Sequence, residues 1–287
     1  MTKFLRKGEF LIIGIQNETT IEELFTKLLL NNANYKVLRK NKEVDDTNLV
    51  KGDNVWIKAF LNEEVNFEPI DRELEVVYED DLLLIVNKEP GIIVHPDGNL
   101  ETETLCNIVA NYYLQTNQHL KVSPIHRLDR ETTGLVIFSK CKVLQPYFDN
   151  LLKEKKINRE YYALVDGYYK PGFKFKVEQP IGKDRHERNK RRISKTGQYA
   201  LSLFECVDAN KENNCALVKC NLKTGRTHQI RVHLSSNNHP IKNDRLYNTR
   251  YDGGKMMLEA YKITIDDFLY DNLVVEIEEM KEFSFYM

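Results

Sequence analysis

Apolar and polar positions along the first sixty residues predict one short strand followed by one helix. The run FLIIGI (residues 10–15) has the length and apolar content of a strand. In TTIEELFTKLLLNN (residues 19–32) the apolar residues recur at the spacing of an amphipathic helix. Thr20 precedes this pattern and Glu23 follows three residues later, which is the pairing of a capping box. The predicted apolar face consists of Ile21, Leu24, Phe25, Leu28 and Leu29.

The segment after this helix, residues 36–60, alternates short apolar runs with polar turns. Turns are expected at Asp45-Asp46 and at Gly52-Asp53, because these residue types favour them. The acidic stretch that follows contains Pro69 and has the composition of a domain boundary. We therefore predict a small α/β domain over residues 1–65, a linker over 66–73 and a second domain over 74–287.

The second domain mixes strand and helix patterns without the regular alternation of a doubly wound parallel fold. Six apolar runs bounded by turn residues predict strands: LLLIV (82–86), LVIFS (135–139), YYALVDG (161–167), ALSLFECV (200–207), CALVKCNL (215–222) and KMMLEAYKI (255–263). Two longer periodic segments predict helices: TLCNIVANYYLQ (104–115) and KVLQPYFDNLLKEKK (142–156). The expected class is α+β, with a large mixed, mostly antiparallel sheet and flanking helices.

Charge is distributed unevenly along this chain of 287 residues. The formal net charge of −1 argues against a nucleic-acid partner, since phosphate-binding proteins tend to carry excess Lys and Arg. However, KDRHERNKRRISK (183–195) has seven Lys or Arg against two acids, and the compensating acids lie in residues 63–81 and near the end of the chain. Such segregation suits a surface that steers an anionic partner. A solvated charged loop is the alternative.

Cysteines and apolar runs argue against two classes of protein. The five cysteines are odd in number, scattered and without a CxxC pair, so neither a disulfide framework nor a zinc site is expected. No apolar run approaches the roughly 18 to 20 residues of a membrane span. We therefore expect a cytoplasmic protein without membrane contact.

HRLDRETTGL (126–135) concentrates charge just ahead of an apolar run. Gly134 and the following strand pattern place Asp129 in a loop that a rigid element anchors, which is a usual position for catalytic groups. Arg127 and Arg130 flank Asp129, and positive neighbours favour the carboxylate. Such a carboxylate suits a nucleophile or an electrostatic stabiliser better than a general acid. Read alone, the segment fits a loop held by side-chain to backbone hydrogen bonds at least as well.

LKTGRTHQIRVHL (222–234) contains two histidines that invite a metal interpretation. His228 and His233 lie five residues apart, which places them on opposite faces of a strand and far around a helix. We therefore expect no metal site there. The alternation over residues 230–234 suits a strand, whereas Thr227 as a cap suits a short helix, and the pattern leaves both open. In either case Arg231 lies among apolar residues and needs a carboxylate partner.

Five segments, taken in order, resemble the RluA-type pseudouridine synthase family. HRLDRETTGLVIFSK (126–140) closely resembles the active-site motif of that family. The other segments resemble its first motif, its tyrosine motif, its arginine motif and its closing strand: VYEDDLLLIVNKEPGIIVHP (77–96), NREYYALVDG (158–167), LKTGRTHQIRVHLSSNNHPIKNDRLY (222–247) and MMLEAYKI (256–263). The resemblance covers about residues 74–285.

The resemblance implies an enzyme that isomerises uridine in RNA to pseudouridine without cofactor, metal or energy source. It implies that Asp129 is the catalytic aspartate, acting on the ribose or on the base, and that Arg231 pairs with it. Tyr161 would pack on the target base and assist removal of the proton from carbon 5. Arg127 would fill the space that the flipped nucleotide leaves. Further RNA contacts are expected from His126, Arg130, Arg226, Lys183, Arg185, Arg191 and Arg192.

The resemblance also implies the partners. The expected substrate is ribosomal or transfer RNA, bound by a monomer with no nucleotide cofactor. The first domain resembles, more distantly, the alpha-L type RNA-binding module shared with a ribosomal small-subunit protein. Its helix carries two Glu and one Lys, so the usual basic helix surface is diluted.

Departures from the family pattern lie away from Asp129, Tyr161 and Arg231. They are KEPG at residues 88–91, Gln198, Ser202, Asn243 and Glu259. We expect the activity to survive them, although they do not allow a particular target nucleotide to be assigned. Other classes of protein fit the sequence less well. A non-catalytic RNA-binding or RNA-chaperone protein would not need all three residues. A glycosidase or nuclease would need a second acid, and a kinase would need HRD and DFG motifs that the chain lacks.

Overall fold

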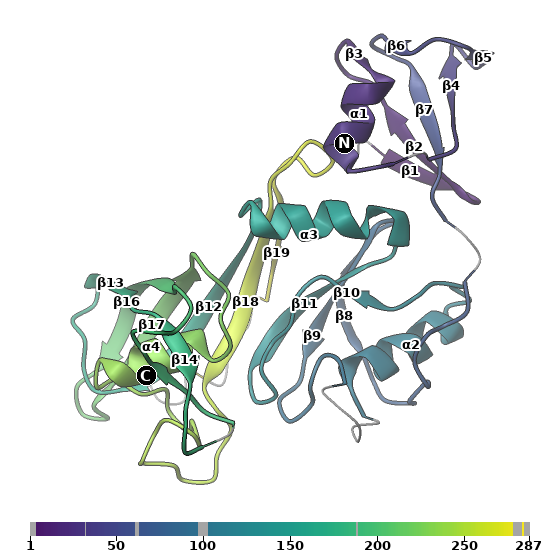
Figure 1. Ribbon diagram of the computed structural model, residues 1–287. Coiled ribbons are helices and arrows are strands. Elements are labelled where there is room, and N and C mark those ends of the chain that lie inside the picture. The colour runs from purple at the N-terminus through teal and green to yellow at the C-terminus, as the bar shows by residue number, and fades with distance from the viewer. Residues whose placement is uncertain are drawn as a thin grey trace.

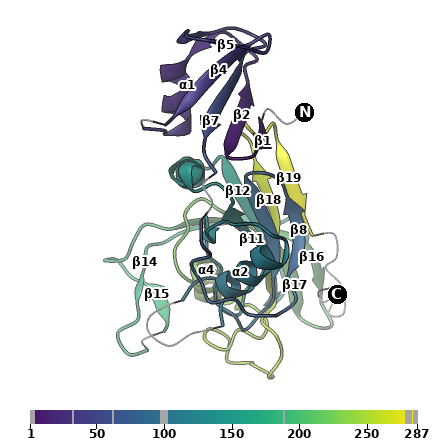
Figure 2. The same ribbon diagram turned by 90° about the vertical axis from the view of Figure 1, so that its right-hand side faces the viewer.

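Two β-sheets dominate the described part of the chain, a small one near the N-terminus and a large one in the remainder (Figure 1). The computed structural model describes residues 4–31, 33–60, 63–96, 103–187, 189–277 and 283. Figure 2 shows from the side that the N-terminal sheet stands above the large one. This architecture confirms the predicted α+β class.

The N-terminal sheet has five antiparallel strands in the order β1-β2-β7-β4-β5. Their bounds are β1 Phe4–Lys7, β2 Phe10–Gly14, β7 Asn54–Lys58, β4 Tyr35–Arg39 and β5 Lys42–Val44. A second pair joins β3 (Thr19–Thr20) to β6 (Asn48–Leu49). Helix α1 (Ile21–Leu28) packs on one face of the five-stranded sheet. The turns predicted around residues 45 and 52 fall between β5, β6 and β7.

Helix α1 begins as its sequence predicts and ends earlier. The Thr20 side chain accepts from the Glu23 backbone N–H, and the Glu23 side chain accepts from the Thr20 backbone N–H, so the capping box is confirmed. The predicted apolar face was wrong at Leu29, which is 43% exposed. Leu29 adopts the left-handed conformation that closes the helix, with its N–H bonded to the Phe25 carbonyl. Its side chain therefore leaves the apolar face.

The large sheet has ten strands and is antiparallel except for one pair. Its main path runs β13-β16-β17-β12-β18-β11-β9-β8, with β10 added to β11 and β19 to β18. The bounds in chain order are β8 Glu75–Glu79, β9 Leu83–Lys88, β10 Ser123–Pro124, β11 Thr133–Ser139, β12 Ile157–Asp166, β13 Lys174–Glu178, β16 Leu201–Asn210, β17 Cys215–Leu222, β18 Leu258–Ile265 and β19 Leu273–Glu276. A separate hairpin joins β14 (Ile181–Lys183) to β15 (Arg191–Ile193) and projects to one side (Figure 2).

Helical segments flank the large sheet, and those within residues 104–115 and 142–156 lie where their patterns predict helices. They are α2 (Leu105–Gln115), a short 3-10 turn η1 (Lys142–Leu144), α3 (Gln145–Lys153) and α4 (Gln229–Ser236). Helix α3 lies beneath the N-terminal domain in Figure 1. In the described part of the chain, no helix is both long and apolar enough to cross a membrane.

The N-terminal domain contacts the second domain directly. The Arg6 backbone N–H donates to Asp81 at 2.8 Å. The rings of Phe4 and Tyr270 meet edge to face with centroids 5.3 Å apart. Apolar residues of both domains also form one continuous cluster. The predicted domain limits remain predictions, although strand β7 ends at Lys58 and β8 begins at Glu75.

Gly134 permits the one parallel strand pair of the sheet. Strands β11 and β18 pair in parallel through Gly134 and Ala260, and Gly134 has φ +108°. A Cβ atom at this glycine would lie 2.3–2.8 Å from backbone atoms of Ala260, so only glycine allows this approach. Ala260 pairs on its other side with Tyr161 of β12. Strand β18 thereby brings the loop before β11 close to Tyr161.

Candidate active site

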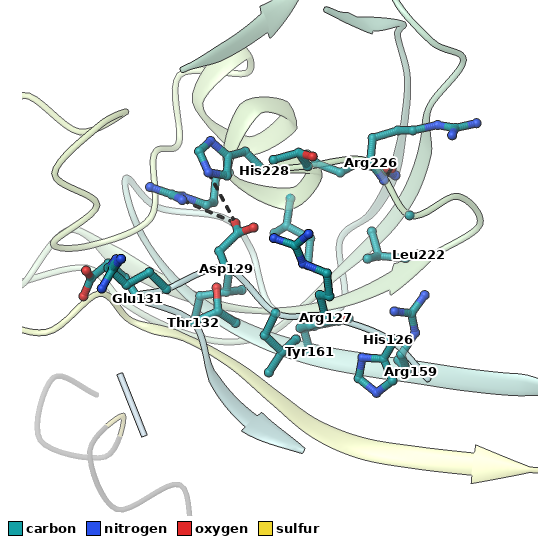
Figure 3. A pocket seen from close by; sticks show the side chains of 18 of the residues that line it. His126, Arg127, Asp129, Glu131, Thr132, Arg159, Tyr161, Leu222, Arg226 and His228 are labelled. Carbon is teal, nitrogen blue, oxygen red and sulfur yellow. Dashed lines mark hydrogen bonds and ion pairs between the residues drawn. The ribbon is translucent and has the colours of Figure 1, made fainter. Parts of the chain in front are cut away.

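The three predicted catalytic residues line one cleft, with a volume of about 1630 Å³ (Figure 3). Asp129 comes from the loop before β11, Tyr161 from β12 and Arg231 from α4. These segments are far apart in the sequence. The fold therefore brings together the residues that the family resemblance singles out.

The loop that carries Asp129 is fixed by backbone hydrogen bonds to a neighbouring turn. The Thr132 N–H donates to the Asp129 carbonyl at 3.1 Å. The Gly91 N–H donates to the Arg130 carbonyl at 2.9 Å, and the Arg130 guanidinium donates to the Gly91 carbonyl at 3.0 Å. These bonds tie the first motif to the Asp129 loop. Arg130 is thus engaged at the edge of the cleft.

Lys88 lies buried beneath this loop, a role that its sequence context did not reveal. Its ammonium group donates to the carbonyls of Glu89, Ile92 and Arg130 at 2.8, 3.0 and 3.0 Å. Burial lowers the pKa of Lys88 to about 7, although the nearby acids, Glu131 first and then Asp129, oppose the shift. Asn87 separates Lys88 from the apolar run LLLIV, and no local feature of the sequence marks Lys88 for such a position.

Arg231 has two carboxylate partners. Its Nη1 lies 3.3 Å from Asp129 Oδ2, so the predicted pairing with Asp129 is present. Its Nε and Nη2 each donate to a different oxygen of Asp244 at 2.8 Å. Asp244 also accepts from the backbone N–H of Leu246. The expected carboxylate partner of a buried arginine is therefore provided mainly by Asp244, which was not predicted.

Helix α4 settles the choice that the pattern of LKTGRTHQIRVHL left open. The segment is helical from Gln229, and its N-cap is His228 in the left-handed conformation with φ 58°. The suggestion of Thr227 as the cap was wrong, because the chain turns into the helix one residue later. His233 is buried and bonds to Ser202 and to the Gln179 carbonyl.

His228 lies between Asp129 and the β14–β15 hairpin. Its Nδ1 lies 2.9 Å from the Tyr247 hydroxyl, and its Nε2 lies 3.8 Å from Asp129 Oδ2. The Tyr247 hydroxyl accepts from the Arg191 backbone N–H at 2.8 Å, so its own proton can go to Nδ1. Burial lowers the pKa of His228, which keeps the imidazole neutral at pH 7. With this proton placement, Nε2 carries its hydrogen toward Asp129.

Tyr161 contributes a neutral phenol to the cleft. Its side chain is buried, and burial raises the pKa of its hydroxyl. Asp129 raises this pKa further, whereas Arg159 lowers it. In the part of the chain that the structure describes, the hydroxyl has no hydrogen-bond partner. Tyr161 can therefore pack against a ligand and offer it a hydroxyl.

Arg127 stands in the cleft between Asp129 and Arg159 (Figure 3). Its side chain is exposed and forms no ion pair within the described residues. A long, uncommitted cation in this position can enter space that a ligand vacates. The geometry thus suits the displacing role that the resemblance implies for Arg127.

The cleft is strongly basic although the chain as a whole is not. Nine Lys or Arg residues line it against three acids. Burial lowers the pKa of Lys155, and the positive charges of Arg159, Arg226 and Lys223 lower it further. Cations that destabilise one another at close range favour an anion between them. Lys153, Lys155, Arg159 and Arg245 belong to this lining but were not among the predicted RNA contacts, because the longest basic run of the sequence lies at 183–195.

The predicted RNA contacts divide into three groups. Arg130, Arg191 and Arg226 line the cleft together with Arg127. Lys183, Arg185 and Arg192 are exposed on the β14–β15 hairpin or its loop, outside the lining of the cleft, and remain predictions. His126 is only 6% exposed, and its Nε2 accepts from the Ile137 backbone N–H at 3.3 Å. His126 also lines the cleft, so the RNA contact predicted for it remains a prediction.

Known proteins resemble the chain in sequence and in fold. The family model for RNA pseudouridylate synthase matches residues 82–236. The Bacillus subtilis protein named uncharacterized RNA pseudouridine synthase YhcT is 35% identical over 247 residues, which cover 84% of this chain and 80% of that protein. Ribosomal large subunit pseudouridine synthase D of Escherichia coli K12 is 32% identical, with 82% of this chain and 70% of that protein covered.

A solved structure shares the fold at lower sequence identity. Human RNA pseudouridylate synthase domain containing 1 superimposes with a TM-score of 0.59 and 22% identity. The superposition covers 74% of this chain and 86% of the human one. The two proteins therefore share a fold over most of this chain.

Proposed function

The chain belongs to the RNA pseudouridylate synthase family and converts uridine in RNA to pseudouridine; we propose that its target lies in large-subunit ribosomal RNA and that Asp129 is the catalytic residue. One observation carries the assignment of the site. The Asp129 carboxylate lies beside Arg231 and Tyr161 in a cleft that nine Lys and Arg residues make basic. The large-subunit relatives support the choice of RNA.

The reaction asks the protein to extrude one nucleotide and hold it. A uridine stacked in folded RNA is unreachable for a carboxylate until it is flipped, at a cost of a few kcal/mol. Lys155, Arg159 and Arg226 would offset this cost by binding phosphates of the flipped strand. Arg127 would occupy the space that the base leaves.

The isomerisation is balanced without any co-reactant. The bond from ribose carbon 1′ to base N1 breaks, a bond from carbon 1′ to base carbon 5 forms, and carbon 5 loses a proton while N1 gains one. We propose that Asp129 acts as a carboxylate on the ribose or the base. Arg231 and the Nε2–H of His228 orient it, and no metal or nucleotide cofactor takes part.

Tyr161 would pack on the detached base. Its hydroxyl pKa is raised by burial, so the neutral phenol faces the base in the resting cleft. A hydroxyl without a protein partner can bond to the uracil ring and assist loss of the carbon 5 proton. Because one chain supplies all of these groups, we propose that it acts as a monomer, in the cytoplasm where ribosomal RNA is modified.

Release of tritium from RNA labelled at uridine carbon 5 tests the role of Asp129. We expect Asp129→Asn to abolish release while RNA affinity stays largely intact, because the phosphate contacts remain. The matched control is Asp149→Asn, the same change at an exposed acid of the same cleft, which should keep its activity. An Asp129→Asn variant as active as wild type would overturn the assignment of Asp129.

The target RNA is tested in cells. A pseudouridine map of total RNA with and without the gene should lose one or more signals in large-subunit ribosomal RNA. Loss confined to transfer RNA would move the substrate to that class. A map without any loss would favour a non-catalytic RNA-binding or RNA-chaperone role on the same fold.

A further inference from the structure

One face of the N-terminal sheet is not covered by α1. Leu11, Ile13, Val55 and Ile57 point toward α1 and belong to the buried cluster. Side chains alternate along a strand, so the residues between them lie on the opposite face. In Figure 1, α1 lies on the left of strands β2, β7 and β4, which leaves the other side of the sheet open.

The strand register places aromatic and basic side chains together on this open face. Across β1, β2, β7 and β4, one row of paired residues runs Leu5, Ile12, Trp56, Lys36. The neighbouring row, across β1, β2 and β7, runs Lys7, Phe10, Lys58. We call these seven residues the open-face cluster.

The aromatic rings of the open-face cluster form its centre. The rings of Phe10 and Trp56 meet edge to face with centroids 5.8 Å apart, and both side chains are partly exposed. Leu5 beside them is 58% exposed. Isolated apolar residues on a surface need no explanation, but three adjacent ones on an uncovered sheet face suit a partner.

Lysines surround these rings. The Lys36 ammonium lies 5.4 Å from the Phe10 ring centroid and 5.1 Å from that of Trp56. The Lys7 ammonium lies 5.4 Å from the Trp56 ring. Lys58 is paired with Glu9 at 3.0 Å. Lys7 and Lys36 thus bring positive charge to the rings, while Lys58 is already engaged.

The α1 side of the domain offers the opposite charge. Its exposed first turn carries Glu22 and Glu23, and Lys27 near its end is the one basic residue of the helix. Phosphate groups would be repelled by the first turn, even though helix N-termini otherwise favour anions. Of the two faces of the sheet, the open one is therefore better suited to RNA than the side that α1 covers.

We propose that the open-face cluster binds a single-stranded segment of the substrate RNA, with bases stacked on Trp56 and Phe10 and phosphates near Lys7 and Lys36. Aromatic platforms bordered by cations are the general means of holding single strands without reading their sequence. The inference rests on the proposed function only in taking RNA as the partner. The contacts of Arg6 and Phe4 with the second domain would hold this second surface fixed relative to the cleft.

Trp56 is the single tryptophan of the chain, so its emission reports on this face alone. The full-length Asp129→Asn protein, which leaves RNA unmodified, is titrated with an unlabelled single-stranded oligouridylate of about twelve nucleotides. We expect saturable quenching of Trp56, with the same Kd that fluorescence anisotropy gives for a labelled copy of the oligonucleotide. Binding seen by anisotropy without any change in Trp56 emission would overturn the inference.

The contribution of individual side chains to RNA affinity is measured with two further substitutions in the Asp129→Asn protein. Trp56→Ala should weaken binding roughly ten-fold, as the loss of one stacked base does. Lys36→Gln should reduce the salt dependence by about one phosphate contact. The control is Tyr35→Ala, which removes an exposed aromatic residue from the same strand as Lys36, on the other face. Equal affinity of Trp56→Ala and Tyr35→Ala, both folded by circular dichroism, would also overturn the inference.

The outcomes separate this inference from the proposed function. If wild-type protein releases tritium but RNA does not quench Trp56, only the proposal of a second RNA-binding surface is refuted. If RNA quenches Trp56 but the protein releases no tritium and no pseudouridine is lost in cells, only the proposed activity is refuted. If this face binds a protein and not RNA, added RNA will leave the Trp56 emission unchanged. That result would overturn the inference.

Discussion

Asp244 holds Arg231 more closely than Asp129 does. Both oxygens of Asp244 accept from Arg231 at 2.8 Å, whereas the contact to Asp129 is 3.3 Å. Asp244 and Arg231 are almost fully buried, with side chains 0% and 4% exposed, and the Asp129 side chain is 24% exposed. Asp244 therefore fixes the guanidinium, and the guanidinium presents its remaining nitrogen to Asp129.

We expect Asp244→Asn to lower both stability and turnover. Breaking a buried ion pair leaves an uncompensated charge and costs on the order of 3 kcal/mol in the free energy of unfolding. Urea unfolding measures this, with Asp129→Asn as the control, because Asp129 is partly exposed and should cost much less. If Asp244→Asn and Asp129→Asn lower the free energy of unfolding equally, Asp244 has no special part in fixing Arg231.

Tyr247→Phe should slow the chemical step while leaving RNA affinity nearly unchanged. The change removes the hydroxyl that lies between the Arg191 N–H and His228, so the imidazole loses the bond that orients it toward Asp129. We expect a roughly ten-fold fall in single-turnover rate, equivalent to about 1.4 kcal/mol. Single-turnover rates measured at saturating RNA separate the effect on the chemical step from any effect on RNA binding. A weaker Kd with an unchanged rate would indicate that Tyr247 serves only the RNA surface.

Local features of the fold could be predicted from the sequence, and contacts made by distant segments could not. The capping box of α1 depends on residues three positions apart, so the sequence predicts it. Asp129, Tyr161 and Arg231 were identified because they lie in motifs that resemble a family. Asp244 and Lys88 carry no such local mark. Asp244 pairs with Arg231 of another segment, and Lys88 bonds to the Arg130 carbonyl as well as to two carbonyls of its own segment, so only the fold reveals their roles.

The basic lining of the cleft illustrates the same limit. The run at 183–195 is conspicuous in the sequence, yet only Asn189 and Arg191 from it line the cleft among the described residues. Lys153 ends α3, Lys155 lies in the turn after it and Arg159 lies in β12, and each looks ordinary in its own element. They become one cationic surface only when helix and strand pack together. Local charge density along a chain is therefore a poor guide to charge density in a cleft.

Gly134→Ala should destabilise the protein and open the site. A methyl group would lie 2.3–2.8 Å from the Ala260 backbone, so β11 and β18 must separate. We expect a loss of about 3 kcal/mol in the free energy of unfolding. The control is Gly172→Ala, where φ is also positive at +83° but nothing lies within 4 Å, so only the backbone strain of about 1 kcal/mol remains. A similar cost at both glycines would show that the close approach to Ala260 relaxes easily.

Lys88 should make stability depend on pH in the alkaline range. Burial lowers its pKa to about 7 in the folded protein, from the ordinary value of 10.5. Between these values the unfolded chain binds the proton more tightly, so stability should rise with pH, by at most about 1.4 kcal/mol per unit. Below about pH 7 both states hold the proton and the dependence disappears. The rise should therefore be absent from Lys88→Met.

Unfolding free energies in urea at pH 7 and pH 9 test this dependence. The difference in unfolding free energy between wild type and Lys88→Met should change by about 2 kcal/mol in favour of wild type as the pH rises. Lys174→Met is the control, because it makes the same substitution at an exposed lysine. If this difference is the same at both pH values, the three carbonyl acceptors of Lys88 offset the effect of burial on its pKa. The ammonium form would then hold the Asp129 loop at both pH values.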